Sequence, residues 1–319
     1  MAKHTYIPAE SPTMYFIGVT TGKSSIMKVF PGWAEELKLD AVIAGFDFPP
    51  NDTPEHYRDV VEFIKHDPNS LGALVTTHKL NLFKASRDLF EGTGPYTQLL
   101  DEASSISKRG DELWGHAKDP ITSGLSLEAI VEPGYWANTG AELLLLGAGG
   151  SSLALTLYLH NKKAAGGDVP TKIIVNNRSA KRLEEMQAVH REIDINIPVE
   201  YNLAPTPEEN DVHVNTLAPG SMVVNATGLG KDRPGSPLTD AVVFPENGIV
   251  WEFNYRGDLI FLDQANAQKE AKNLTVEDGW VYFIHGWTRV IAEVFHIDIP
   301  TSGPQFERLS AIAENIAFN

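Results

Sequence analysis

The sequence predicts an α/β protein made of two units. Short apolar runs alternate along the 319 residues with helical patterns, an order typical of parallel sheets covered by helices. The length suits one large or two ordinary domains. Between two sets of runs lies PITSGLSLEAIVEPGYWANTG (120–140), a helical pattern with a Pro/Gly-rich end, which we interpret as a connector. We therefore expect a first α/β unit that ends near residue 120 and a second that begins near residue 140.

The individual elements follow from these patterns. Short apolar runs predict strands at residues 14–19, 41–48, 72–77, 142–148, 171–177, 221–227 and 248–255. Apolar residues at helical spacing predict helices at residues 33–39, 54–67, 152–164, 180–193, 279–295 and 304–318. The last helix is amphipathic, so we expect it to pack as a closing helix, with an oligomer contact left open.

Composition excludes several classes of function. The net charge is −16, from 26 Lys and Arg against 42 Asp and Glu, and a field of this sign repels nucleic acid and anionic membranes. Cysteine is absent, which excludes disulfides, thiolate catalysis and Cys-ligated zinc and fits a reducing cytoplasm. We see no signal peptide and no apolar run long enough to cross a bilayer. We expect a cytoplasmic protein with a small-molecule substrate; a homodimer is left open.

A dinucleotide signal lies in AELLLLGAGGSSLALTLYL (141–159), where an apolar strand leads through a glycine-rich turn into a helix. Gly147 permits the tight turn, and Gly149 lets the backbone approach a pyrophosphate. Ser152 takes the third glycine position, where it is small enough for close helix–strand packing. Gly150 and Ser151 open the helix, whose free N–H groups and positive dipole end favour an anion. The pattern predicts a dinucleotide-binding domain.

The end of the next predicted strand indicates whether the dinucleotide is NAD or NADP. An NAD enzyme usually carries an acidic residue at the end of this strand, to bind the ribose hydroxyl. This chain has Asn177, Arg178 and Ser179 there, with Lys181 or Arg182 behind. A guanidinium with amide and hydroxyl donors suits a 2′-phosphate, so we expect NADP in preference to NAD. The alternative is an ordinary strand-to-helix turn with a solvated basic face.

The segment GVTTGKSS (18–25) looks at first like a nucleotide-phosphate loop. That pattern, however, needs four residues between its glycines, and only three separate Gly18 from Gly22. The other interpretations are a different site that needs a lysine and a run of hydroxyls, or helix N-capping by Ser24 or Ser25.

Several segments together resemble one family. They are LVTTHK (74–79), HAKDPITSG (116–124), GAGGSS (147–152), NNRS (176–179), NATGLG (225–230) and WEFNY (251–255). Each motif is modest, but their order and spacing resemble the shikimate/quinate dehydrogenase family over nearly the whole chain. The family pattern has a proline where this chain has Thr77. Glu252 stands at the acidic position of the family's D-x-x-Y segment.

The resemblance implies an N-terminal α/β substrate-binding domain, a Rossmann-type domain, and C-terminal helices that return to the substrate side. We therefore assign residues 1–120 and 280–319 to the substrate-binding domain and residues 140–275 to the NAD(P)-binding domain. Residues 121–139 and 276–279 are expected to be connectors. The implied activity is reversible oxidation of a secondary alcohol on a small molecule. The cofactor carries the hydride, and the protein must supply an acid/base and hold both partners.

The resemblance also implies residue roles. It makes Lys79 the acid/base and Asp119 its partner, with His78 as structural support. The bland alternative is a surface lysine and a helix cap before Pro120. The implied substrate contacts are Ser24, Ser25, Thr76, Ser105, Tyr255 and His285. For Tyr255 the alternative is a buried strand aromatic. The residues implied on the nicotinamide side are Asn225, Thr227 and Gly230. The Gly/Pro-rich loop KDRPGSP (231–237) follows them and is expected to be a lid or a surface turn.

The substrate positions depart from the family pattern. Ser105 replaces the asparagine of A-V-N-T, Ala117 and Lys118 replace the first two residues of N-T-D, and His285 replaces a glutamine. A site built for specific hydroxyls discriminates strongly, so we expect a different polyhydroxylated, carboxylated, cyclic substrate and weak turnover of shikimate. The alternative is a non-catalytic regulatory protein that binds NAD(P) and a ligand. His78, His116 and His285 lack metal-ligand spacing, so we expect no metal.

Overall fold

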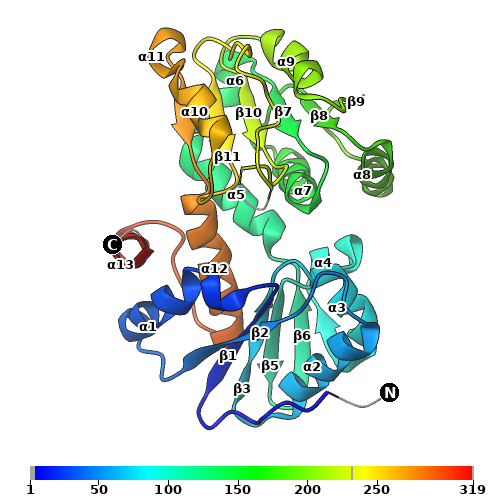
Figure 1. Ribbon diagram of the computed structural model, residues 1–319, viewed down its shortest axis with the longest axis vertical. Helices are drawn as coiled ribbons and strands as arrows, with labels where there is room; N and C mark the ends of the chain where they lie inside the picture. Colours follow the sequence, from blue (N-terminus) through cyan, green and yellow to red (C-terminus); the bar gives the residue numbers. More distant parts are fainter. Residues whose placement is uncertain (1–3, 231–232, 318–319) are drawn as a thin grey trace. The chain divides into compact units, whose positions relative to one another are not determined.

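The computed structural model describes residues 4–230 and 233–317 and divides the chain into two compact units. The first contains residues up to Lys118 and those from Ile284 onward, and the second extends from Asp119 to Phe283. Each has its own six-stranded sheet (Figure 1). The predicted α/β class is confirmed, and the C-terminal segment returns to the first unit. Residues 121–139 and 276–279, expected as connectors, lie within the second unit.

The first sheet has the strand order β2-β1-β3-β5-β6-β4. Its strands are β1 (Thr13–Gly18), β2 (Val42–Asp47), β3 (Ser70–Val75), β4 (Phe90–Thr93), β5 (Ser105–Arg109) and β6 (Glu112–His116). The helical segments of this unit are η1 (Thr21–Lys23), α1 (Ile26–Leu37), α2 (Pro54–His66), α3 (Lys79–Ser86), η2 (Arg87–Leu89), α4 (Pro95–Leu100) and α13 (Pro304–Ala317). Helix α12 (Trp280–Phe295) begins in the second unit and ends in the first.

Both faces of the interior strand β1 are covered, since all six of its residues are buried. Tyr15 and Ile17 belong to a core cluster that includes Tyr57 and Val60 of α2. On the other face, the ring of Phe16 packs edge-on against Trp287 of α12, with centroids 5.0 Å apart. This two-sided burial explains why β1 appears in the sequence as a continuous apolar run.

The expectation of parallel sheets is met by β1, β2 and β3, but β5 runs antiparallel to both β3 and β6. Strands β4, β5 and β6 were not predicted. They are short and carry charged or glycine residues, as in SISKR and ELWGH, so their apolar pattern is weak. Gly110 and Asp111 join β5 to β6, and a two-residue Gly-Asp turn between alternating runs is a hairpin signal that could have revealed them.

Gly72 in β3 is the position of this sheet least able to accept a side chain. Its φ is +132°, and a Cβ would lie 2.1 Å from the carbonyl oxygen of Ile106 on β5. We expect Gly72→Ala to lower the free energy of unfolding by about 3 kcal/mol or more, through strain and displacement of the pairing strand. Urea unfolding would measure it. Gly110→Ala is the matched control: φ is +65° with open space around it, so a loss of only about 1 kcal/mol is expected. Equal losses for the two variants would contradict the steric argument.

The second sheet is entirely parallel, in the order β12-β11-β10-β7-β8-β9. Its strands are β7 (Leu143–Leu146), β8 (Ile173–Asn177), β9 (Val199–Leu203), β10 (Met222–Asn225), β11 (Ile249–Glu252) and β12 (Thr275–Glu277). The helices are α5 (Asp119–Ile130), α6 (Tyr135–Thr139), α7 (Gly150–Ala164), α8 (Ala180–Glu192), α9 (Pro207–Asn215), α10 (Ile260–Asn266) and α11 (Lys269–Lys272).

Alternate residues of β7 enter two different cores. Leu143 and Leu145 pack with residues of α7 and α8, whereas Leu144 and Leu146 pack with Val214 of α9 and Phe261 of α10. The sheet is therefore covered on both faces. Because β8 lies on one side of β7 and β10 on the other, the strand order reverses at β7. Ligands of such sheets bind outside the carboxyl ends of the strands at this point.

Candidate active site

A pocket of about 550 Å³ opens at the carboxyl ends of β7, β8 and β10 in the second unit. It is lined by the turn after β7, the turn from β8 into α8, the start of α9 and the loop after β10. Of the predicted cofactor residues, the lining includes Gly147, Gly149, Asn177, Arg178, Ser179 and Thr227. The fold therefore brings together residues that are up to 80 positions apart in the sequence.

Hydrogen bonds hold the glycine turn after β7 in place. Gly147 has a φ of +109°, and its N–H donates to Asn176 O at 2.8 Å. The Ser152 hydroxyl donates to Gly147 O at 2.6 Å and is fully buried, so this side chain closes the turn from behind. Gly149 precedes α7, whose first residues are Gly150 and Ser151. An anion at this turn would meet unsatisfied N–H groups at the start of a helix.

Cationic side chains line the pocket, and no carboxylate does among the described residues. The lining cations are Arg178, Arg182 and Arg233. Arg182 lies 2.7 Å from Glu185, while the Lys181 ammonium is 3.9 Å from the same carboxylate and Lys181 is not among the lining residues. Arg233 was not predicted as a cofactor residue. It belongs to the predicted loop 231–237, of which residues 231 and 232 lie outside the described part of the chain.

A network of asparagines that the sequence did not reveal supports the pocket wall. Asn176 is 1% exposed; its amide donates to Asn210 Oδ1 of α9 at 3.1 Å and its oxygen accepts from Asn202 of β9 at 3.2 Å. Asn210 also donates to Pro237 O at 3.0 Å. These bonds fix α9 and the loop after β10 to the sheet.

The predicted nicotinamide-side residues lie at the end of β10 and in the loop that follows it. The Asn225 side-chain oxygen accepts hydrogen bonds from the N–H and hydroxyl of Thr227, at 3.1 and 2.7 Å. Gly230 has a φ of +85°, and its N–H donates to Arg233 O at 2.7 Å. This loop therefore has a defined backbone around an exposed Thr227.

In the first unit, the segment 18–25 forms a short turn after β1 and not a wide phosphate cradle. The N–H of Thr21 donates to Asp47 Oδ1 at 2.8 Å, and its hydroxyl donates to the same oxygen at 2.5 Å. A carboxylate that occupies these donors would repel a phosphate. Ser25 precedes α1 without making a side-chain capping bond, and Ser24 is half-buried like Ser25. The hydroxyls are therefore not used as helix caps.

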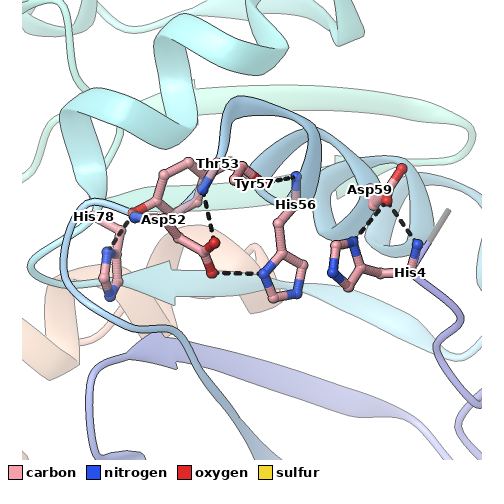
Figure 2. Close-up of polar contacts among 7 residues, drawn as sticks. All are labelled: His4, Asp52, Thr53, His56, Tyr57, Asp59 and His78. Carbon is pink, nitrogen blue, oxygen red and sulfur yellow. Dashed lines mark hydrogen bonds and ion pairs between the residues drawn. The ribbon is translucent and has the colours of Figure 1, made fainter. Parts of the chain in front are cut away.

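His78 and Lys79 follow β3 but have different surroundings. His78 is 2% exposed, and its Nδ1 lies 2.8 Å from the Tyr57 hydroxyl (Figure 2). Burial lowers the pKa of His78, which suits a neutral supporting side chain. Lys79 is the first residue of α3 and is half-buried; its N–H donates to Thr76 O at 3.0 Å. Asp119, also half-buried, is the first residue of α5 in the second unit.

Figure 2 also shows a polar chain across α2 beside His78. The His56 Nδ1 lies 2.6 Å from Asp52 Oδ2, and the Asp52 N–H donates to the Tyr57 hydroxyl at 3.2 Å. His4 bonds to Asp59 and stacks on His56 with ring centroids 3.8 Å apart. Together these contacts tie the N-terminal segment and the loop after β2 to the helix that supports His78.

No group of three or more His, Asp or Glu side chains placed to hold a metal ion occurs among the described residues. The three histidines that we considered have separate partners. His78 bonds to Tyr57, the His116 Nε2 lies 2.9 Å from Glu293, and His285 stacks on Phe306. Within the described residues, no helix combines the length and apolar character needed to cross a membrane.

Comparison with known proteins gives one curated relative and many similar structures. No protein-family model matches the chain. The shikimate dehydrogenase (NADP(+)) of Acinetobacter baylyi is 28% identical over 179 residues, which cover 53% of this chain and 59% of that protein. The chain therefore spans about three fifths of the length of the curated relative it matches.

Solved structures agree in fold over almost the whole chain. A shikimate dehydrogenase in complex with NADP+ has a TM-score of 0.72 at 16% identity, covering 98% of this chain and 97% of the other. Quinate dehydrogenase from Corynebacterium glutamicum in complex with NAD has a TM-score of 0.72 at 15% identity, covering 95% and 98%. The chain has the fold of the shikimate and quinate dehydrogenases and resembles one shikimate dehydrogenase in sequence over part of its length. The 5-ketofructose reductase of Gluconobacter sp. strain CHM43 shares the fold, with a TM-score of 0.71 at 17% identity and coverage of 96% and 99%.

Lys118, which stands where the N-T-D pattern has a threonine, is paired with a carboxylate. The Lys118 ammonium lies 2.7 Å from Glu293 of α12, and the other oxygen of this carboxylate lies 2.9 Å from His116. Hydrogen bonds from His116 and Lys118 hold the pKa of Glu293 well below its usual range. Lys118 therefore forms an internal ion pair, and the altered N-T-D segment gains no isolated positive charge.

The remaining residues predicted to contact substrate are mostly enclosed. Ser105 has no exposed surface and pairs in register with Leu74 and His116. His285 is 2% exposed, and burial, with Arg289 nearby, lowers its pKa to about 4. Thr76 is half-buried, and its hydroxyl donates to Ile17 O at 3.3 Å. In the second unit the half-buried Tyr255 contacts the rings of Trp280 and Phe283, so it is part of an aromatic cluster.

Proposed function

We propose that the protein is an NADP-dependent oxidoreductase that interconverts a secondary alcohol and a ketone on a small polyhydroxylated substrate. The observation that carries the proposal is the pocket of the second unit, where three arginines and, among the described residues, no carboxylate line the end of a dinucleotide-type strand–turn–helix. The curated relative is named a shikimate dehydrogenase (NADP(+)), and NADP+ and NAD occur in complexes of the same fold.

The residues of the pocket fit a phosphorylated dinucleotide. Arg178 offers a forked guanidinium at the end of β8, where a carboxylate would select NAD instead. Arg182 and Arg233 add positive charge around it, and the start of α7 behind Gly149 offers N–H groups for the pyrophosphate. The bound cofactor would accept or supply the hydride.

The chain itself must move the proton. In the proposed mechanism Lys79 takes the proton of the substrate hydroxyl during oxidation and returns it during reduction, and Asp119 orients and stabilises the lysine. Ser24, Ser25, Thr76, Ser105 and Tyr255 would hydrogen-bond to the substrate. His285 would do so as a neutral imidazole, because its pKa of about 4 leaves it uncharged at neutral pH.

The substrate that we propose is a polyhydroxylated, carboxylated, cyclic molecule other than shikimate. Ser105 and His285 replace amide side chains, and Lys118 is paired internally with Glu293, so the hydrogen-bond pattern offered to a ligand differs from that of shikimate enzymes. The similarity of fold to a 5-ketofructose reductase supports a range of polyhydroxylated substrates on this scaffold. Turnover of shikimate and quinate should therefore be weak in a spectrophotometric assay, and rates like those of dedicated enzymes would contradict this choice.

Cofactor titration tests the proposal directly. We expect NADPH to bind tightly and NADH weakly, and Arg178→Ser to raise the Kd for NADPH about 10- to 100-fold while that for NADH changes little, because the variant loses a charged hydrogen bond to the 2′-phosphate. Nucleotide fluorescence would give both constants. Arg191→Ser, in the last turn of α8, is the control and should leave both unchanged. Failure of both cofactors to bind would refute the oxidoreductase and favour a protein whose chemistry has been replaced.

A further inference from the structure

Glu252 is a buried carboxylate at the end of β11, with no exposed surface. It lies directly beside Asn225, its register partner at the end of the neighbouring strand β10. The geometry points to Glu252 as a positioning residue that sets the orientation of the Asn225 amide and, through it, the shape of the cofactor-facing loop 226–230. This inference rests on the proposed cofactor function of the pocket.

Three N–H groups donate hydrogen bonds to the two oxygens of this carboxylate. Asn225 Nδ2 donates to Glu252 Oε2 at 2.5 Å. Asn254 donates to the other oxygen twice, from its backbone N–H at 2.8 Å and from its side chain at 2.6 Å. These three donors offset the cost of burying a carboxylate. If Glu252 lost its charge, the donors would lose the charged acceptor that they surround.

The Asn225 amide transmits this arrangement to the loop. Because its Nδ2 is bonded to Glu252, its oxygen must face the other way, where it accepts from the Thr227 N–H and hydroxyl at 3.1 and 2.7 Å. The Thr227 hydroxyl oxygen in turn accepts from the Leu229 N–H at 3.1 Å. Ala226, Thr227 and Leu229 all line the pocket. A chain of directional hydrogen bonds therefore links the Glu252 side chain to the pocket wall.

Only a side chain that accepts hydrogen bonds and cannot donate them fixes the orientation of the Asn225 amide. A carboxylate can accept from Asn225 but cannot donate to it, so a flipped amide would face it with oxygen against oxygen. A glutamine in its place could present either end, and both orientations of Asn225 would become accessible. Such a flip would set the Asn225 NH₂ group against the N–H of Thr227 and disturb the loop.

The inference predicts a measurable defect and its rescue. Glu252→Gln should raise the Kd for NADPH about tenfold, the effect of losing one or two charged hydrogen bonds, and should speed amide hydrogen exchange across residues 225–230 in the cofactor-free protein. The double variant Glu252→Gln with Asn225→Asp reverses the polarity of the pair. The new glutamine would donate to the new aspartate, which still accepts from Thr227, so we expect exchange protection and most of the affinity to return.

The single variant Asn225→Asp completes the double-mutant cycle. It places two carboxylates side by side and should be worse than Glu252→Gln in both measurements. Rescue in the double variant separates an oriented pair from general damage to the fold, since two independent lesions would add. The inference is overturned if Glu252→Gln leaves both loop exchange and Kd within twofold of the parent, or if the double variant is no better than the poorer single variant.

Failure of the proposed function would look different. If the parent protein binds neither NADPH nor NADH, the oxidoreductase proposal falls. The exchange rates of the cofactor-free parent and variants would still decide whether Glu252 orders the loop.

Discussion

Replacing Lys79 with alanine should reduce turnover about 1,000-fold or more and leave the Kd for NADPH unchanged. The loss is that of a general acid/base, whose contribution is about 100- to 10,000-fold. Cofactor affinity should survive because the cofactor pocket is built from residues of the second unit, whereas Lys79 begins α3 in the first. The measurements are kcat on an alcohol found by screening and a fluorescence titration of NADPH.

The chain offers a matched control in the same helix. Lys84 is exposed in the last turn of α3, where its ammonium lies 3.4 Å from Asp101. Lys84→Ala removes an equal charge and should keep normal turnover. A Lys79→Ala variant that retains more than a tenth of the parental kcat would show that the acid/base lies elsewhere.

Acidification should destabilise both units through buried histidines. His190 in the second unit and His285 in the first are each 2% exposed, and burial lowers both pKa values from the ordinary 6.5 to about 4. The unfolded chain therefore takes up these protons first. The stability that each neutral imidazole contributes is complete above pH 6.5 and is lost as the pH falls towards 4. The loss is about 2 kcal/mol per histidine by pH 5 and about 3 kcal/mol by pH 4.

Urea unfolding between pH 7 and pH 4 would measure this loss. The double variant His190→Gln with His285→Gln removes both titrating groups and should show a much shallower decline, whatever its stability at pH 7. His66→Gln, at an exposed position in the last turn of α2, should decline like the parent. Equal slopes for the parent and the double variant would assign acid sensitivity to other groups.

The fold was predictable where apolar patterns were strong. All seven predicted strands are present, as β1, β2, β3, β7, β8, β10 and β11, and the fold class is confirmed. β9 and β12 were missed, like the β4–β6 set, because VEYNL and TVE are short and half exposed. Helix α1 begins at Ile26 and not near residue 33, because Ile26, Val29 and Trp33 bury one face although Pro31 interrupts the helical propensity.

The candidate site divides in the same way. The glycine turn at 147–149 and the Asn177–Arg178 pair were predictable because they lie at the ends of two strands that the sequence predicts, β7 and β8. Arg233 and Asn210 carried no such local signal and reach the pocket only through the packing of the loop after β10 and of α9. The roles of Lys79 and Asp119 remain predictions from the family resemblance.

By itself, the sequence determined the class of the fold and the dinucleotide-type turn, since these depend on periodicity and on local backbone chemistry. Only the tertiary structure decided that Lys118 is paired with Glu293 across 175 positions, and that Glu252 lies behind Asn225. Such pairs depend on strand register and helix docking, which bring distant residues within hydrogen-bond distance and leave no pattern along the chain.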